Sequence, residues 1–385
     1  MHIVFLNVTG SLGGAEQVLL TLIRALRMLR PDWRFTVVMG DAGPLAQSVA
    51  AAGGAPDILP FPDGLKALGD WGVVSKWSLG LKLASAVPAV LRYRSALRQR
   101  LLALAPDVVQ TNGFKMHLMG ALACPRNMRL IWHVHDFVST RAAMKTLLRW
   151  CSGRPQAIAA ISAPVAADWK SVVRYPNRVR TVWNAIDLQR FSPSAEQPSA
   201  EQAFGKQAAR IGLVATFARW KGHEVFLHAL SMLPCDLAWQ AAIIGGEVYN
   251  RVASQFSESE LRQLCERLGL AAKVEFTGFL ADPAATIASL AIVVHASTEP
   301  EPFGLVIAEG MAAGKAIVTS SDTLITDGVD GLLHQRGDAA SLAGALERLL
   351  RDADLRTQLG QQARQTAVCR FQPARMAGDF LELYQ

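Results

Sequence analysis

The chain has 385 residues, of which 51% are hydrophobic and 18% are charged, and its formal net charge is +7. This composition excludes an intrinsically disordered chain, and the length allows two or more domains with cores of their own. Five scattered cysteines without a CxxC pair favour reduced, mostly buried thiols in the cytoplasm over a disulfide framework or a zinc site. We expect no transmembrane helix, because no run of about 18 apolar residues occurs, and no secretory signal, because the apolar opening MHIVFLNV is too short.

Apolar, β-rich runs alternate with helical patterns along the chain. In the first half we expect strands at 1–8, 34–40, 107–113, 129–137, 156–162 and 178–186, and helices at 15–29, 117–123, 142–153 and 164–172. Residues 192–206, rich in Ser, Pro, Gln and Glu, predict an interdomain linker. Strands resume at 209–218, 237–246, 273–279, 291–297 and 315–321, and the tail 339–385 is expected to be wholly helical. The pattern predicts an α/β fold of two doubly wound parallel sheets, with ligands at the carboxyl ends of the strands.

The loop after the first expected strand contains the adjacent glycines Gly13 and Gly14. Adjacent glycines at the start of a helix let backbone amides approach an anion closely. Because the spacing is not G-x-G-x-x-G, the dinucleotide fingerprint fails, although Asp41 after the second strand resembles its acidic residue. The loop predicts either an anion site or a purely structural turn.

Residues 71–106 contain no Asp or Glu. Basic and aromatic residues are interleaved there with apolar ones: Lys76, Lys82, Arg92, Arg94, Arg98, Arg100, Trp71 and Trp77. Such a mixture is typical of helices that meet an anionic membrane surface, and Pro88 is expected to separate two short helices. The alternative is a pair of ordinary surface helices. No nucleic-acid partner is expected, since no binding motif accompanies the charge.

The strand at 129–137 ends in a pair of histidines, and strand alternation places His133 and His135 on one face. A histidine at the mouth of a parallel sheet can share a proton with a substrate hydroxyl near neutral pH. The alternatives are buried histidines with satisfied hydrogen bonds and a metal-binding pair, for which no third ligand lies at a useful spacing.

Two charged motifs follow strands in the second half. Arg219 and Lys221 suit a departing diphosphate, although surface cations are common. The block EPEPFGLVIAEGMAAG at 299–314 predicts a helix from about 303 to 314, with Glu301 just before it and Glu309 about two turns along. At the start of this helix, backbone amides are expected to point toward an anion or a sugar oxygen, and they belong to Phe303, Gly304 and Leu305.

This block resembles the E-x(7)-E motif of retaining glycosyltransferases of the GT-B fold, specifically glycosyltransferase family 4. Weaker motifs follow in the family's order over nearly the whole chain: GGAE at 13–16, HD at 135–136, WNAID at 183–187, KG at 221–222, TGF at 277–279 and DGVDGLL at 327–333. The resemblance implies two Rossmann-like domains that face each other across a cleft.

The resemblance also implies roles for single residues. Gly14, beside Gly13, would place its amide against the donor diphosphate, and His135 rather than His133 would lie beside the transferred sugar. Lys221 would hold the phosphates. Glu301 would contact hydroxyls of the donor sugar and Glu309 those of the ribose, whereas the backbone near Gly278 and Phe279 would hold the base.

Two positions depart from the family pattern. Ala215 and Thr216 stand where the family commonly has Gly-Arg, and Arg219 is the candidate replacement for that cation. The segment 320–324 replaces a loop that usually contains a Gly-Gly pair and is several residues shorter. These departures leave open a non-catalytic nucleotide-sugar-binding protein, and the fold leaves open a nucleotide-sugar epimerase.

The implied reaction is transfer of a hexose or similar sugar from a UDP- or GDP-sugar to an acceptor hydroxyl, with retention by front-side attack and without a metal or other cofactor. We expect an acceptor-side domain at 1–191, the linker at 192–206, a nucleotide-sugar-binding domain at 207–365, and a C-terminal helix at 366–385 that crosses back to the first domain. The acceptor is expected to be lipid-linked or a saccharide, in the assembly of a surface polysaccharide or glycolipid. The protein is expected in the cytoplasm; its position at the inner face of the membrane is a hypothesis that depends on residues 71–106.

Overall fold

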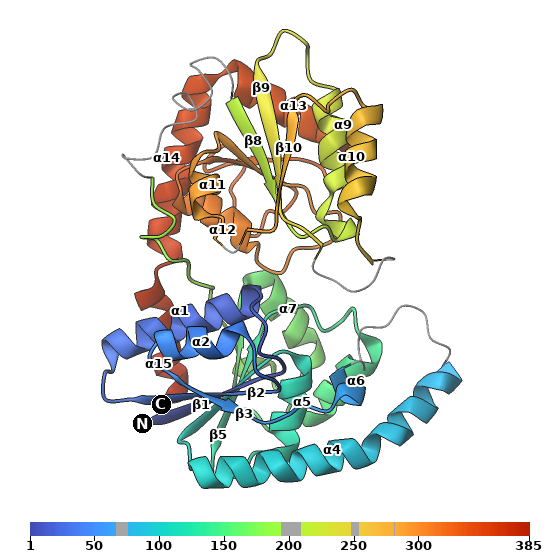
Figure 1. Cartoon of the computed structure of the whole chain (residues 1–385). Coiled ribbons are helices and arrows are strands. Elements are labelled where there is room, and N and C mark those ends of the chain that lie inside the picture. The colour runs from blue at the N-terminus through green and yellow to red at the C-terminus, as the bar shows by residue number, and fades with distance from the viewer. Residues whose placement is uncertain (67–75, 194–208, 248–253, 281) are drawn as a thin grey trace. The chain divides into compact units, whose positions relative to one another are not determined.

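The computed structural model describes residues 1–66, 76–193, 209–247, 254–280 and 282–385, and of residues 76–85 the backbone alone. It divides into two compact units (Figure 1): unit 1 is Met1–Ala185 with Pro373–Gln385, and unit 2 is Ile186–Gln372. The expected linker lies outside the described residues except for its first two positions, 192 and 193.

The units divide at other positions than the sequence pattern suggested, because residues 186–191 and 366–372 group with unit 2. The Ile186 amide donates to the carbonyl of Phe371 at 2.9 Å. The Arg364 guanidinium donates to the carbonyls of Leu188 and Phe191 at 3.4 and 3.2 Å. These bonds attach the segment after Ala185 to the last helix of unit 2.

Unit 1 contains a parallel sheet in the order β3-β2-β1-β4-β5-β6-β7. The strands are β1 His2–Asn7, β2 Arg34–Met39, β3 Ala55–Ile58, β4 Val108–Asn112, β5 Arg129–Val134, β6 Ala157–Ala160 and β7 Val179–Thr181. β1 is buried along its whole length, as expected of a strand covered on both faces. The sequence pattern missed β3, an edge strand of sequence APDI whose residues are largely exposed, so that no apolar periodicity marks it.

The helices of unit 1 are α1 Gly14–Leu29, α2 Pro44–Ala51, α3 Asp63–Lys66, α4 Lys76–Leu104, α5 Phe114–Ala123, α6 Ala142–Cys151, α7 Ala163–Val172 and α15 Pro373–Tyr384, with a 3₁₀ turn η1 at Pro176–Arg178. In Figure 1 the red α15 lies beside the blue α1, although the two helices come from opposite ends of the chain. The face of α15 that includes Phe380 and Tyr384 is buried in unit 1.

The expectation of two short helices around Pro88 is wrong, because α4 is one helix of 29 residues that contains Pro88. Proline inside a helix removes one amide donor and crowds the carbonyl four residues before it, at a cost of about 3 kcal/mol that burial of apolar side chains can offset. The apolar stripe of Tyr93, Leu97 and Leu101 is buried. Burial of this stripe, which has helical spacing, stabilises the second half of the helix.

Unit 2 contains a parallel sheet in the order β10-β9-β8-β11-β12-β13. Its strands are β8 Ala209–Val214, β9 Trp239–Ile244, β10 Val274–Gly278, β11 Ile292–His295, β12 Ala316–Thr319 and β13 Leu332–Leu333. Around them lie the 3₁₀ turn η2 Arg219–Lys221 and the helices α9 His223–Ser231, α10 Glu258–Arg267, α11 Ala284–Ala288, α12 Leu305–Ala312, α13 Ala339–Arg351 and α14 Ala353–Arg370. The two-residue β13 was not expected, since two residues carry no periodicity.

The C-terminal tail is not continuously helical, and the helix expected at 366–385 is divided. Asp352 ends α13 and caps α14, its side chain accepting from the amide of Leu355. A second interruption at 371–372 separates α14 from α15, which starts at Pro373. Proline lacks an amide donor and disfavours helical geometry in the residue before it, so a new helix starts there.

Each sheet reverses its strand order once, between β1 and β4 in unit 1 and between β8 and β11 in unit 2. Ligands of doubly wound sheets bind outside the carboxyl ends of the strands at such a reversal. The sheets therefore direct attention to the loops that follow these four strands. Among the described residues, no helix combines the length and the apolar character needed to cross a membrane.

Candidate active site

In unit 2 two predicted site residues lie in contact. Lys221 ends the turn after β8, and Glu301 lies in the loop after β11. Because β8 and β11 pair in parallel, their following loops emerge at the same edge of the sheet. The Lys221 Nζ and the Glu301 Oε2 are 2.9 Å apart, and both side chains are largely buried, 26% and 13% exposed.

A glycine allows the two loops to approach. Gly222 has φ +76°, and a Cβ there would lie 1.9 Å from the carbonyl oxygen of Ala296. Only glycine fits at such a distance and at a left-handed φ. The Thr298 amide donates to the Trp220 carbonyl at 2.8 Å and ties the same two loops. Lys221 is therefore positioned by backbone contacts on both sides.

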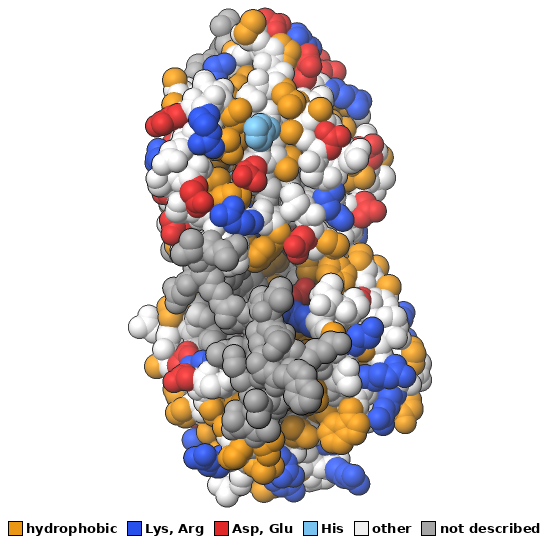
Figure 2. Space-filling model, turned by 90° about the vertical axis from the view of Figure 1, so that its right-hand side faces the viewer, with side chains coloured by type: hydrophobic (Ala, Val, Ile, Leu, Met, Phe, Trp, Pro, Cys, Tyr) orange, Lys and Arg blue, Asp and Glu red, His pale blue; other side chains and the backbone are white. Residues whose placement is uncertain are grey.

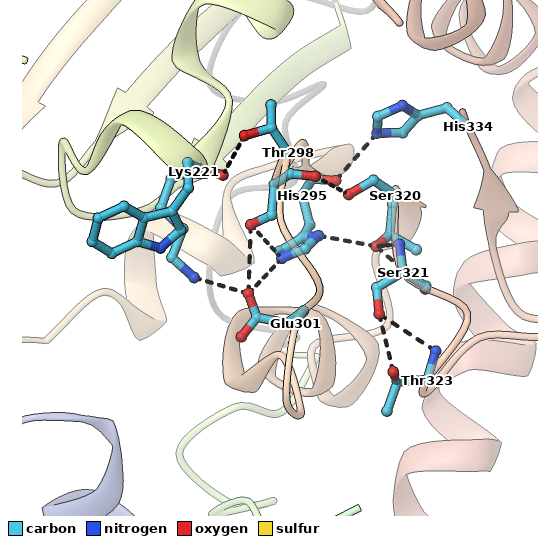
Figure 3. A network of polar contacts seen from close by, with 11 residues as sticks. Lys221, His295, Thr298, Glu301, Ser320, Ser321, Thr323 and His334 are labelled. Carbon is cyan, nitrogen blue, oxygen red and sulfur yellow. Dashed lines mark hydrogen bonds and ion pairs between the residues drawn. The ribbon is translucent and has the colours of Figure 1, made fainter. Parts of the chain in front are cut away.

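Three donors converge on one oxygen of Glu301 (Figure 3). Besides Lys221, the His295 Nε2 lies 3.0 Å and the Ser297 Oγ 3.4 Å from the Glu301 Oε2. Within the described residues, none of the hydrogen bonds to this carboxylate uses Oε1. Sequence reasoning missed His295 and Ser297, which lie within an expected strand and belong to no recognised motif.

The charge of Glu301 follows from these contacts. Burial alone would raise the pKa of its carboxyl group, but the hydrogen bond from His295 and the positive charge of Lys221 outweigh burial and lower the pKa to about 2. Glu301 is therefore ionised at neutral pH and can only accept hydrogen bonds.

The helix that follows starts slightly later than expected, at Leu305 rather than near Phe303. Gly304 precedes it with φ +89°, a left-handed conformation. Phe303 is 2% exposed, and its ring lies edge-on to Phe371 at 5.7 Å, which anchors the start of α12. The first amides of an α-helix have no partner within the helix, so this start suits an acceptor oxygen.

Glu309 lies on α12 and is separate from the Glu301 cluster. Burial raises the pKa of its carboxyl group to about 7, against the lowering effect of the Arg190 charge. Arg190 itself pairs with Asp282 at 2.9 Å. No hydrogen bond or ion pair from the described part of the chain engages the Glu309 carboxylate.

Arg219 does not join Lys221 at Glu301. Its guanidinium lies over the ring of Phe256 at 4.2 Å and reaches Glu260 at 3.4 Å. The two cations of this turn thus have different partners. Arg219, the candidate replacement for the family arginine, contacts Glu260 on α10.

The residues expected near the base lie after β10. Gly278 ends this strand with φ +72°, and its carbonyl accepts from the Gly245 amide at 3.1 Å. Phe279 is 68% exposed and lies close to Gly246, where a Cβ would be 3.3 Å from the Phe279 Cβ. An exposed ring at the end of a strand offers an apolar face to a planar ligand.

The short segment at 320–324 packs onto the Glu301 cluster. The Ser320 Oγ donates to the Ser297 carbonyl at 2.7 Å, and the Ser321 amide donates to the Thr319 Oγ1 at 3.0 Å. Leu324 is 1% exposed. This segment therefore supports the loop after β11 from the side of β12, as Figure 3 shows for Ser320 and Ser321.

In unit 1 the glycine loop is held by two acids. The Gly13 amide donates to Glu16 Oε2 at 3.0 Å, at the start of α1. The Gly10 amide donates to Asp41 Oδ1 at 2.6 Å, and the other oxygen of Asp41 pairs with Lys66 at 2.8 Å. Asp41 thus anchors the loop before Gly14. This structural role explains an acidic residue at position 41 without a dinucleotide-binding site.

The rings of His133 and His135 lie close together, with centroids 4.1 Å apart and planes tilted by 50°. His133 is fully buried, and its Nδ1 lies 3.3 Å from the Gln110 Nε2, whereas the hydroxyl of Tyr384 donates to the Gln110 Oε1 at 2.6 Å. His135 follows β5 and is half-buried, and burial lowers its pKa to about 4, so it is neutral at pH 7. No group of three or more potential metal ligands was found among the described residues.

Comparisons with known proteins agree with this geometry. The family model described as Glycosyltransferase Family 4 matches residues 12–190, and the model described as Glycosyl transferases group 1 matches residues 195–366. The lipopolysaccharide core biosynthesis glycosyltransferase LpsE of Rhizobium meliloti is 29% identical over 58% of this chain, and the match spans 62% of LpsE. The putative glycosyltransferase EpsD of Bacillus subtilis is 25% identical over 81% of this chain and 85% of its own.

Among solved structures, that of Anabaena HepE in complex with UDP has a TM-score of 0.81 at 23% identity, and the likeness covers 99% of both chains. This likeness shows the fold, and it confirms the GT-B fold expected from the sequence. Two family models that together match residues 12–190 and 195–366 leave little of the chain unmatched. The chain belongs to the group 1 glycosyltransferases of family 4.

Proposed function

We propose that this protein transfers a sugar from a UDP- or GDP-sugar to an acceptor hydroxyl with retention at the anomeric carbon. The observation that carries the proposal is the Glu301 carboxylate, which is ionised and held at Oε2 by Lys221 and His295, while Oε1 takes part in none of its hydrogen bonds with the described residues. An anchored carboxylate with one available oxygen suits the hydroxyls of a sugar.

Lys221 lies beside this carboxylate and is the group proposed for the diphosphate. A cation near the departing phosphate stabilises the negative charge that develops as the glycosidic bond breaks. The acceptor hydroxyl would attack from the side of the leaving group and lose its proton to the departing phosphate oxygen. Neutral His135, in unit 1, is proposed to lie beside the transferred sugar as a hydrogen-bond partner.

The named relatives support a nucleotide-sugar donor and a glycan acceptor. Other solved complexes of HepE contain UDP-glucose, or UDP and glucose. LpsE is described as acting in lipopolysaccharide core biosynthesis. We therefore place the reaction of this chain in the assembly of a surface polysaccharide or glycolipid, with a lipid-linked or saccharide acceptor.

A peripheral position at the inner face of the cytoplasmic membrane remains part of this proposal. The exposed side of α4 carries Val87, Leu91 and Leu102, which are 49–54% exposed. On α6, Trp150 is 64% exposed. Figure 2 shows basic and hydrophobic side chains gathered on unit 1, with few acidic ones between them. Apolar side chains beside cations suit an anionic lipid surface.

Three of the four arginines of α4 also have partners in other elements of unit 1, whereas Arg92 donates to the carbonyl of Pro88, one turn earlier in α4, at 3.4 Å. Arg100 pairs with Asp57 of β3 at 3.3 Å. Arg94 and Arg98 donate to the carbonyls of Leu122 and Ala123, in the last turn of α5, a helix end that favours cations. Trp71 lies outside the described residues, as do the side chains of Lys76, Trp77 and Lys82. The structural support for membrane contact is therefore the apolar side chains and Arg92.

Thermal unfolding with a panel of UDP, GDP and their sugars tests the proposed function. A ligand that binds only the folded state at about 100 times its Kd stabilises it by roughly 2.7 kcal/mol and raises the Tm. The stabilising donor is then incubated with and without glycan acceptors, and the anomeric configuration of the product is read by NMR. Conversion without an acceptor would identify an epimerase, and no shift with any ligand would overturn the proposal.

A further inference from the structure

His295 links Glu301 to the sheet. It is the last residue of β11, and its side chain is 7% exposed. One ring nitrogen, Nε2, contacts the Glu301 Oε2 at 3.0 Å, and the other, Nδ1, contacts the Thr319 Oγ1 at 3.1 Å on the neighbouring strand β12. The imidazole is thus fixed at both nitrogens between the sheet and the carboxylate.

The hydrogen-bond partners determine where the ring proton lies. The ionised Glu301 can only accept, so the His295 Nε2 carries a proton and donates it. The Thr319 hydroxyl accepts from the Ser321 amide at 3.0 Å and can direct its own proton to Nδ1. With a proton on Nε2, the imidazole donates to Glu301 and accepts from Thr319 at Nδ1, and Nε2 also lies 3.1 Å from the Ser297 Oγ.

His295 and Lys221 differ as anchors of Glu301. Lys221 has a long flexible side chain, and a bound diphosphate would attract its ammonium group away from the carboxylate. His295 has no such freedom, since Thr319 holds its second nitrogen. Ser297 is the third contact, at 3.4 Å, and is the longest. When the diphosphate of a nucleotide sugar engages Lys221, His295 is the residue that still holds the Glu301 carboxylate.

We propose that His295 is a positioning residue of the donor-sugar site, which holds Oε2 of Glu301 so that Oε1 accepts hydroxyls of the transferred sugar. This inference rests on the proposed function and adds to it a residue outside the motifs. Because the sugar and not the nucleotide is the ligand of Glu301, loss of His295 reduces affinity for a nucleotide sugar and leaves affinity for the nucleoside diphosphate nearly unchanged.

Two substitutions of similar polarity provide the test. His295→Gln extends an amide donor to about the place of Nε2, whereas His295→Asn is one methylene shorter and reaches only the side of Thr319. Affinities for UDP and UDP-glucose, and for GDP and GDP-mannose, are measured calorimetrically for the wild type and both variants. Circular dichroism and thermal unfolding confirm that each variant folds, and His228→Asn, at an exposed position of α9, serves as the control.

We expect the Asn variant to bind the nucleotide sugar about tenfold more weakly, with less than about a twofold change for the nucleoside diphosphate, and the Gln variant to stay within about threefold of the wild type for both. An equal loss of affinity for the nucleotide sugar and the nucleoside diphosphate would overturn the role of His295. Equal affinities in the Gln and Asn variants would also overturn it. If either variant fails to fold, Thr319→Val, which removes the partner of Nδ1, must show the same selective loss. A wild type that binds neither kind of ligand would overturn the proposed function itself.

Discussion

Lys221 and Glu301 are 80 positions apart in the chain, and their side chains form a partly buried ion pair of 2.9 Å. The cation proposed for the phosphates thus lies against the carboxylate proposed for the sugar. In a bound nucleotide sugar, the diphosphate would contact Lys221 and the sugar hydroxyls would contact Glu301. We therefore expect binding of the nucleotide sugar to be coupled to rearrangement of this ion pair.

Lys221→Ala should weaken binding of UDP or GDP by about 1.5–3 kcal/mol and leave binding of the free nucleoside within about twofold, because only the diphosphate contacts the ammonium group. Isothermal titration measures both affinities. Arg219→Ala is the matched comparison: since Arg219 already contacts Phe256 and Glu260, its removal should cost less than about 1 kcal/mol. Unchanged diphosphate affinity in Lys221→Ala would contradict the assignment.

Glu309 should make stability depend on pH. Its folded pKa of about 7 lies above the ordinary value of 4.5, so between pH 4.5 and 7 the folded state binds more protons than the unfolded state. Stability therefore falls as the pH rises through this window, by about 1–3 kcal/mol. Glu309→Gln should unfold at a higher temperature than the wild type at pH 8 and at a similar one at pH 4.5. A stability difference that is the same at both pH values would show that the carboxyl group is not desolvated.

The same carboxyl group is proposed to accept ribose hydroxyls. A charged acceptor lost from a binding site costs on the order of 1–3 kcal/mol, so at pH 8, where the Glu309 carboxyl group with its pKa of about 7 is ionised, Glu309→Ala should raise the Kd for the donor accordingly. Titration calorimetry on the folded variant gives the value, and an unchanged Kd would remove Glu309 from the site.

His133 and His135 should behave differently on substitution. His135→Ala is expected to lower kcat by at least about tenfold while the donor Kd changes little. His133→Ala removes a fully buried ring that contacts Gln110 and Phe380, and its main expected effect is a loss of about 2–4 kcal/mol of stability. Steady-state kinetics and urea unfolding separate the effects, and a larger kcat loss in His133→Ala would reverse the assignment.

Tyr384→Phe tests the attachment of the C-terminal helix to unit 1. It deletes the buried hydroxyl that donates to Gln110, and should cost about 1–2 kcal/mol because the amide oxygen is left without this donor. Tyr175→Phe, at a residue 47% exposed, is the control and should change stability by less than about 0.5 kcal/mol. Equal effects in the two variants would mean that the Tyr384 hydroxyl contributes nothing specific.

Membrane contact can be tested with the exposed α4 residues Val87, Leu91 and Arg92. Val87→Ser, Leu91→Ser and Arg92→Gln together leave Arg94, Arg98 and Arg100 with their partners in unit 1. The wild type should co-sediment with anionic vesicles, less so as salt is added, and the triple variant at least about fivefold less. Equal recovery with neutral and anionic vesicles, or none with either, would remove membrane contact from the proposed function.

Local pattern was enough to predict most of the fold. Periodicity and capping depend on residues close together in the chain. They predicted the alternating strands and helices, the helix after Gly304 and the glycine loop before α1. The sequence pattern did not predict the exposed strand β3, the two-residue strand β13 or the short helices α2 and α3. The continuous α4 escaped because local preference at Pro88 gave way to burial of one face of the helix.

The contacts between side chains were decided only by the tertiary structure. Motifs identified Lys221, Glu301 and Arg219, but the pairing of β8 with β11 and the close approach at Gly222 join the first two. Arg219 instead contacts Phe256, which precedes α10, and Glu260, which lies on α10. His295 has no motif, and its importance comes from neighbours on β12 and in the loop after β11. Sequence periodicity reports which face of an element is buried, whereas the partner of a charged side chain depends on strand order and loop approach, which residues far apart in the chain determine together.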